Sequence, residues 1–490
     1  MSPTLILSII AIYFAILFVI GKITSKGADN NSFFVGNKQS PWWVVAFGMI
    51  GTSLSGVTFI SVPGWVGTSQ FSYMQMVLGY LVGYTVIATV LMPLYYRLNL
   101  TSIYTYLDDR FGRASYRTGA AFFLLSRTIG AAFRLYLVAG VLQLTVFDAW
   151  GIPFFVTVVA TIVFIWLYTY EGGIKTIIWT DTLQTLFMLL AVIATVVIIS
   201  SELGFGFGEM VAAIKNSEYS KVFFFNDVNH PKYFWKQFMA GAFISIVMTG
   251  LDQDMMQKNL SCKNVGEAQK NMFSFSIVLV AVNLFFLALG ALLYMFATAK
   301  GITLPSKADD LYPIIATTGE LPIIVGVLFI LGLIAAAYSS ADSALAALTT
   351  SACVDILDIE EKPKQEQVKL RKQVHIAMSA ILVLTIMMFR WINDDSVISA
   401  LFKVAGYTYG PLLGLYAFGL FSKRGIRDRL APLICIASPI VTYFINANSE
   451  ALFNGYKFGF ELLILNGAIT FFGLFCISTI KNVATNDVGR

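Results

Sequence analysis

The chain has 490 residues, of which 57% are hydrophobic and 12% are charged, and its formal net charge is +5. A soluble globular domain carries about 25% charged residues, so this composition excludes a soluble protein and indicates a polytopic membrane protein. The four cysteines match no zinc or redox spacing and the two histidines form no ligand cluster. We therefore expect neither a metalloenzyme nor any other enzyme, and no nucleic-acid partner.

Thirteen segments are apolar enough to cross a bilayer, which takes about 20 largely apolar residues. They are expected at 3–23, 42–66, 71–97, 118–146, 152–170, 175–201, 233–257, 270–298, 320–352, 372–392, 397–421, 430–446 and 459–480. The first lacks the basic start and the cleavage site of a signal peptide, so we interpret it as a retained helix. The sequence thus predicts one transmembrane domain over residues 1–490.

The loop charges predict the orientation of these helices. With the N-terminus placed outside, most loop lysines and arginines fall in cytoplasmic loops, among them Lys258 and the run from Lys362 to Lys372. Positive loops stay on the cytoplasmic side. We therefore predict a multi-pass protein of the plasma (cell inner) membrane with an external N-terminus and a cytoplasmic C-terminus.

Two of the predicted helices are interrupted in mid-membrane. Gly48 to Thr58 combines three glycines with four hydroxyls, and Thr249 to Asp254 interrupts an apolar run. Glycine weakens a helix, and hydroxyls or carboxylates can pair with the freed backbone groups. Paired interruptions in two halves of a chain point to the binding site of a transporter. Tight helix packing is the alternative, and it is our interpretation of the pair Gly79 and Gly83 in the third segment.

The segment 320–352 carries hydroxyls and a carboxylate where lipid would disfavour them. Ser339, Ser340 and Ser343 lie within about one helical turn, with Asp342 among them. A carboxylate at membrane depth costs about 2.5–3.5 kcal/mol, so it needs a partner or a function. Clustered oxygens favour a hard-cation site. The other charges inside predicted helices are expected to face the bundle interior, with structural ion pairing as the alternative; they are Arg127, Arg134, Asp181, Asp252, Asp254 and Lys403.

Four motifs together resemble the sodium:solute symporter family, and in particular its bacterial sodium/sugar and sodium/sialic acid symporters. Residues 51–59 resemble the family's broken first helix, and 170–184 resemble its GG-x5-WTD-x2-Q signature. Residues 252–258, followed by 267–270, resemble its sixth-helix pattern, and 335–340 its eighth-helix sodium motif.

The resemblance implies an all-α fold of the LeuT type, with two inverted five-helix repeats. The repeats would occupy 42–201 and 233–421, with an extra N-terminal helix at 3–23 and two C-terminal helices within 430–480. It also implies a sodium site made by the carbonyls of Gly51, Leu54 and Ala336 and the hydroxyls of Ser339 and Ser340. Unwound carbonyls and hydroxyls are the oxygen ligands that a hard cation prefers.

Some relatives bind a second sodium ion, and the corresponding residues here are Asp181, Ser339, Asp342 and Ser343. Asp342 stands where those relatives have serine. Two carboxylates would hold a second cation more strongly, or they would share a proton.

The substrate residues depart from those of the sialic acid carriers. Ala131 stands at the arginine position and Arg134 follows one turn later, while Gly79 stands at the glutamine position and Gln75 precedes it by one turn. Candidate substrate contacts are Thr52, Ser53, Ser55, Gln75, Arg134, Asp252 and Gln253. Packing or helix stabilisation is the alternative for each.

We therefore expect a sodium-coupled secondary active symporter that imports a small polar organic solute by alternating access, with a sugar, polyol or sugar acid favoured. Sodium would be the coupling ion and the lipid bilayer the surroundings, and the sequence indicates no obligatory protein partner. The alternative is a proton-coupled or dual-cation carrier of an organic anion on the same fold, which would use Asp181 and Asp342. A membrane sensor built on a transporter scaffold is a weaker alternative.

Overall fold

The computed structural model describes residues 3–24, 39–169, 173–392 and 397–479, and helices make up most of them. The α-helices of the first half are α1 (Pro3–Thr24), α3 (Trp42–Ser53), α4 (Gly56–Ser69), α5 (Tyr73–Val86), α6 (Met92–Arg97), α7 (Thr105–Arg110), α8 (Arg113–Leu142), α9 (Phe154–Thr169), α10 (Gly173–Glu202) and α11 (Phe207–Asn216). Those of the second half are α12 (Phe234–Ser245), α13 (Gln253–Leu260), α14 (Val265–Lys300), α15 (Leu311–Thr317), α16 (Ile323–Ser351), α17 (Lys364–Ile392), α18 (Val397–Thr408), α19 (Gly410–Phe421), α20 (Ala431–Ala447), α21 (Ser449–Leu452) and α22 (Leu462–Cys476).

Short π-helical and 3₁₀ segments extend or join these helices. The π-helical segments are η2 (Ile87–Leu91), η3 (Gln143–Phe147), η5 (Ile246–Gly250) and η7 (Ala352–Ile356). The 3₁₀ segments are η4 (Asp148–Trp150), η6 (Ala308–Asp310), η8 (Ile359–Glu361) and η9 (Asp428–Leu430). Two short strands, β1 (Gly425–Ile426) and β2 (Ser478–Thr479), pair antiparallel, so the loop before α20 contacts the residues that follow α22.

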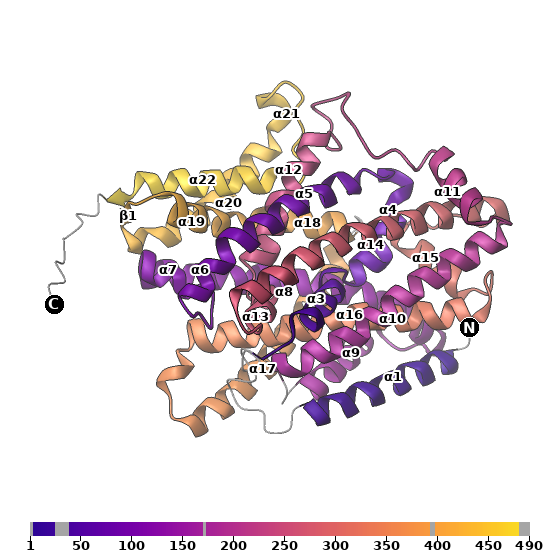
Figure 1. The fold of residues 1–490 in the computed structure, drawn as a ribbon, viewed down its shortest axis with the longest axis horizontal. Coiled ribbons are helices and arrows are strands. Elements are labelled where there is room, and N and C mark those ends of the chain that lie inside the picture. The colour runs from indigo at the N-terminus through magenta and orange to yellow at the C-terminus, as the bar shows by residue number, and fades with distance from the viewer. Residues whose placement is uncertain (1–2, 25–38, 170–172, 393–396, 480–490) are drawn as a thin grey trace.

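The long helices run side by side along the longest axis of the molecule (Figure 1). The loop helices α11 and α15 gather at one end of the bundle, and α7 lies at the other. Helix α1 begins at the end that carries α11 and α15, whereas the β1–β2 pair lies at the opposite end. The described chain therefore begins and ends at opposite ends of the bundle, which agrees with the predicted odd number of crossings.

Within the described residues, eight helices are long and apolar enough to cross a membrane, or ten when each bent pair is taken as one span. Four shorter apolar helices lie at Phe154–Leu167, Val397–Thr408, Gly410–Phe421 and Leu462–Cys476. Each of the thirteen expected segments thus contains an apolar helix, while the number of complete crossings stays a prediction.

Both predicted helix interruptions are confirmed. Helix α3 ends at Ser53 and α4 begins at Gly56, and the two axes differ by 52°. The second break lies between Gly250 and Gln253, where the axis turns by 64°. A third break, at Tyr409 between α18 and α19, is absent from the predicted single segment 397–421. Its physical cause is Pro411, which has no backbone N–H to donate to the Tyr407 carbonyl; the Asn466 side-chain amide donates to that carbonyl instead.

The packing role predicted for Gly79 and Gly83 is confirmed by the contact between α5 and α12. A Cβ atom on Gly79 would lie 2.0 Å from the Phe238 carbonyl oxygen, and one on Gly83 would lie 1.8 Å from Ser245 Oγ. Only glycine lets the two backbones approach this closely.

Candidate substrate and cation site

The break between α3 and α4 faces the hydroxyl-rich part of α16. Ser340 Oγ lies 3.4 Å from the Thr52 carbonyl oxygen, to which it donates. Gly51 and Leu54 flank Thr52 and Ser53 at the end of α3, where carbonyl groups lack helical partners. A Cβ atom on Gly51 would lie 2.2 Å from Thr185 Oγ1, so glycine is needed here for α3 to approach α10. The structure thus brings the elements of the predicted sodium site together; the ligand roles of Gly51, Leu54, Ala336, Ser339 and Ser340 stay predictions.

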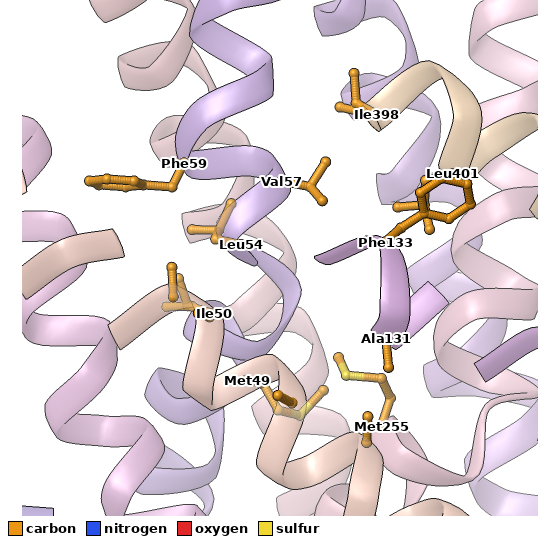
Figure 2. Packing of buried hydrophobic residues seen from close by; sticks show 14 of the residues in the cluster. Met49, Ile50, Leu54, Val57, Phe59, Ala131, Phe133, Met255, Ile398 and Leu401 are labelled. Carbon is orange, nitrogen blue, oxygen red and sulfur yellow. The ribbon is translucent and has the colours of Figure 1, made fainter. Parts of the chain in front are cut away.

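Apolar side chains surround this break, as Figure 2 shows. Val57 points toward Ile398 and Leu401 of α18, while Phe59 points to the opposite side of α4. Leu54 lies at the break and Ile50 in the last turn of α3, and both are buried. Buried apolar side chains thus lie next to the polar groups of the break. They lower the local dielectric, which strengthens the interactions of these groups with a cation or with one another.

Asp181 of α10 joins four helices through its side chain. Its Oδ1 accepts a hydrogen bond from Ser339 Oγ of α16 at 2.7 Å, and its Oδ2 accepts one from Thr52 Oγ1 of α3 at 3.0 Å. Its fourth helix is α13, because Lys258 Nζ lies 2.5 Å from Asp181 Oδ2 and also contacts Thr52 Oγ1. Residues 170–172, at the start of the signature that contains Asp181, lie outside the described residues.

The expectation that Lys258 lies in a cytoplasmic loop is wrong. Its side chain is 1% exposed, and it belongs to α13 on the far side of the second helix break. The predicted apolar segment 233–257 ends just before Lys258, so hydropathy places Lys258 in the following loop, whereas α13 continues to Leu260 and is buried in the bundle. Without Lys258, most loop lysines and arginines still fall in the loops that are predicted to be cytoplasmic.

The other two residues of the predicted second-cation site have different neighbours. Ser343 Oγ donates to the Ser339 carbonyl at 2.9 Å and lies 3.4 Å from Asp254 Oδ2. Asp342 is fully buried, and its Oδ1 accepts from the Ser343 backbone amide at 2.6 Å. Shared ligation of one cation by Asp181, Asp342 and Ser343 therefore stays a prediction.

A second buried ion pair lies one turn away on α13. Asp254 pairs with Arg127 of α8, both side chains being at most 3% exposed, and Arg127 Nη1 also lies 3.9 Å from Asp252 Oδ2. Tyr409, at the break between α18 and α19, donates to Asp252 Oδ2 at 2.7 Å. Asp252 additionally caps α13 by accepting from the Asp254 amide at 3.0 Å. Asp252 thus serves a structural network in this structure.

A cavity of about 80 Å³ lies beside the α3–α4 break. Of the predicted substrate contacts, Thr52, Ser53, Ser55 and Arg134 line it. Gln75 and Gln253 are not in its lining: Gln75 bonds the Phe224 amide and the Lys232 carbonyl, and Gln253 bonds the Ile103 amide and the Thr101 carbonyl. Lining residues that were not predicted as substrate contacts include Tyr73, Tyr80, Tyr84, Thr249 and Asn283. Their only sequence signal was polarity inside apolar helices.

Arg134 differs from Arg127 in its surroundings, although both lie on one face of α8, seven residues apart. Both arginines line the cavity and both are buried, with residue exposures of 2% for Arg127 and 8% for Arg134. The Arg134 Nε has no hydrogen-bond partner, and no hydrogen bond or ion pair joins the Arg134 guanidinium to another residue in the described parts of the chain, whereas Arg127 pairs with Asp254. A buried cation of this kind is costly unless an anion comes to it.

A larger hollow of about 730 Å³ lies on the other side of α18. Val397 and Ser399 line this vestibule, whereas Ile398, Leu401 and Phe402 line the central cavity, so α18 separates the two. Aromatic rings reinforce the separation: Phe402 packs on Tyr73 and on Phe460, with ring centroids 6.4 and 5.1 Å apart.

Asp309, in the loop that borders the vestibule, fixes the start of α18. Its Oδ2 accepts from the Val397 amide at 3.1 Å. Burial raises the pKa of this carboxyl above its ordinary value, so it takes up a proton at a higher pH than an exposed aspartate.

Comparison with known proteins places the chain in a family. Residues 33–428 match the model of the sodium:solute symporter family. The sodium/sialic acid symporter NanT of Aliivibrio fischeri is 25% identical over 91% of this chain and 88% of its own length. The human sodium/iodide cotransporter is 26% identical over 79% of this chain and 61% of its own length.

A solved structure of a Na+-coupled sialic acid symporter, in its substrate-bound outward-open state, has the same fold. It covers 96% of this chain and 97% of the solved chain, with a TM-score of 0.80 and 21% identity. The predicted all-α fold of the LeuT type is thereby confirmed, while the boundaries 42–201 and 233–421 of the two repeats stay predictions. The chain is a membrane transporter rather than an enzyme, and it belongs to the sodium:solute symporter family.

Proposed function

We propose that this sodium-coupled symporter imports a small organic anion, such as a sugar acid, by alternating access. The observation that carries the proposal is the guanidinium of Arg134, which is buried, borders the central cavity and has no ion-pair partner among the described residues. Arg127 on the same helix face already has Asp254. A carboxylate in the cavity would give Arg134 the same kind of partner, with two parallel hydrogen bonds.

The relatives support an anion as the class of substrate. Sialic acid carries a carboxylate and iodide is itself an anion, and the two relatives named for them share the family of this chain. Hydroxyls of Thr52, Ser53 and Ser55 border the same cavity, so a polyhydroxylated acid would find acceptors and donors there. A sugar acid therefore fits the lining better than a neutral sugar, which would leave the Arg134 guanidinium without a direct ion-pair partner.

Coupling follows from the position of the cavity. Sodium bound between the α3–α4 break and Ser340 would hold α3 against α16, next to the cavity that receives the solute. Each ligand then favours the conformation in which the other site is formed, and such differential binding is what couples the two fluxes. We expect opening on one side to move α18 and Phe402, and opening on the other to move α13, which the Arg127–Asp254 pair holds to α8.

The proposal is tested by thermal-shift measurements on the purified protein in sodium or potassium buffer. The probes are N-acetylneuraminate, gluconate and lactate, each compared with a neutral solute such as N-acetylmannosamine or glucose. We expect at least one acid, and no neutral solute, to raise the unfolding temperature in sodium only. A neutral sugar that stabilises the protein as strongly as any acid would overturn the proposal.

Arg134→Gln provides the residue-level test. Hydrogen bonds to a charged group contribute about 1.5–3 kcal/mol, so affinity for the stabilising acid should fall by about tenfold to a hundredfold. The matched control is Arg117→Gln on the same helix, because Arg117 is 51% exposed and pairs with Asp358. Unchanged affinity in Arg134→Gln, with the control also unchanged, would remove Arg134 from the substrate site.

A further inference from the structure

Lys258 is one of the largest fully buried side chains among the described residues, and its ammonium lies in the predicted cation-binding region. The ammonium contacts the Asp181 carboxylate at 2.5 Å and the Thr52 hydroxyl. A carboxylate and a hydroxyl are oxygen ligands of the kind that a hard monovalent cation takes. The ammonium of lysine is a compact unit charge, so it can occupy such a position itself.

The residues around this ammonium are those from which a second sodium site would be built. Asp181 is the carboxylate that the sequence assigns to the second cation, and Ser339, which it holds at 2.7 Å, belongs to the same set. Ser343, another member of the set, instead donates to the Ser339 carbonyl and faces Asp254. The predicted ligands of the second cation therefore do not meet at one point. Asp181 and Ser339 lie together, and the Lys258 ammonium already supplies a positive charge beside Asp181.

We propose that the Lys258 ammonium is the permanent second cation of this carrier, so that each chain binds one sodium ion and not two. The inference rests on sodium-coupled symport and specifies its stoichiometry. A sodium ion at Asp181 would have to displace the ammonium or lie within a few ångströms of it. Two unit charges at that separation repel strongly inside a protein. The tether also keeps the ammonium at a high effective concentration, which a free ion must overcome.

The position of Lys258 also lets its ammonium hold several helices together. Lys258 follows the break in the second interrupted helix, and Thr52 lies just before the break in the first. Through Asp181 the ammonium joins both broken helices to α10 and α16. A second sodium ion would make this connection only while bound, whereas Lys258 makes it without any ion from solution.

The test counts sodium ions on the purified full chain by equilibrium binding of 22Na+. We expect one ion per chain for the wild type and for Lys258→Arg, which keeps the charge. Lys258→Met removes the charge and keeps the apolar stem, so Asp181 becomes available and two ions should bind. Lys258→Met combined with Asp181→Asn removes the carboxylate as well, and the count should return to one.

A second measurement covers the case in which Lys258→Met folds poorly. The unfolding temperature of each variant is compared in sodium and in N-methylglucamine buffer. If sodium replaces the missing ammonium, sodium should stabilise Lys258→Met more than it stabilises the wild type, a difference that the double variant should lose. The proposal would be overturned if sodium stabilised Lys258→Met no more than it stabilises the wild type. It would also be overturned if the folded Lys258→Met protein bound only one sodium ion.

The wild-type count separates this proposal from the function on which it rests. Two ions on the wild type would refute the fixed second cation and leave sodium symport intact. No sodium on the wild type would instead contradict sodium coupling itself. The Arg134 measurements are independent of both outcomes, because they vary the solute and not the number of ions.

Discussion

Ser339 and Ser340 are neighbours on α16, yet their hydroxyl groups have different partners. Ser340 Oγ reaches the Thr52 carbonyl at the break of the first interrupted helix, whereas Ser339 Oγ donates to Asp181 at 2.7 Å. Ser340 therefore borders only the predicted sodium site, whereas Ser339 lies between that site and the Lys258–Asp181 pair. We expect the two serines to have separable effects on sodium binding.

The first prediction concerns Ser340→Ala. Loss of one hydroxyl ligand should weaken sodium binding by about tenfold to a hundredfold, because a hydrogen bond or contact to a charged group contributes about 1.5–3 kcal/mol. The measurement is the sodium concentration that gives half-maximal 22Na+ binding. Thr349→Ala is the control, since Thr349 is a buried hydroxyl on the same helix that bonds the Leu345 carbonyl and the His375 ring, away from α3 and α13. Sodium affinity that is equal in the two variants would exclude Ser340 as a ligand.

At the level of single residues, the sequence was informative where the signal is local. The hydroxyls around Ser340 and the glycines around Gly51 are anomalous within apolar helices, so they could be recognised without a fold. Lys258 could not, because its partner Asp181 lies 77 residues away and the pair depends on how α10 and α13 pack. The sequence likewise could not show that Arg134 lacks an ion-pair partner, because this depends on Asp254 binding Arg127 and not Arg134.

Helix α13 is the element that the two buried ion pairs hold in place. Asp254 and Lys258 are four residues apart and so share a helix face. The acid binds Arg127 of α8, and the base binds Asp181 of α10. Removing one partner of a buried pair costs about 3–5 kcal/mol, so α13 moves only when both contacts move with it or are replaced. Such an element suits a transporter with two distinct conformations better than one with a continuous range.

Close packing of α5 on α12 gives the second prediction. Gly79→Ala would drive a methyl group into the Phe238 carbonyl, and overpacking of this kind costs about 1–3 kcal/mol. The unfolding temperature of the purified protein should fall. Gly140→Ala is the control, because a Cβ atom there meets nothing within 4 Å, and alanine should leave the temperature unchanged or raise it. A Gly79→Ala protein as stable as the control would show that these helices can separate without cost.

Element boundaries were predictable where hydropathy and glycine content change together. The breaks at residues 54–55 and 251–252 follow runs of glycine and polar residues, and both were expected. The break at Tyr409 has a weaker signal, Gly410 followed by Pro411, inside an unbroken apolar run. The extension of α13 to Leu260 was not predicted, because this helix is polar although it is buried, and a hydropathy scale does not distinguish such a helix from a loop.

The whole molecule has its described ends on opposite faces of the bundle (Figure 1). The loop charges predict that the face with α11 and α15 is external. The third prediction is therefore made with single cysteines in a Cys476→Ser background, since Cys476 is exposed and the other three cysteines are buried. Ser306→Cys, in the vestibule, should react with a membrane-impermeant maleimide on intact cells, and Glu366→Cys, at the start of α17, should not. Reversed reactivity would invert the orientation.

The fixed charge of Lys258 has an electrical consequence for the transport cycle. Lys258 and Asp181 stay with the protein, so the only charges that cross the membrane are those of the sodium ion and the solute. One sodium ion together with a monovalent anion carries no net charge. The membrane potential supplies about 2.3 kcal/mol per charge at 100 mV, and this carrier would draw none of it. Its anion would accumulate in proportion to the sodium concentration ratio, whether the cell is polarised or not.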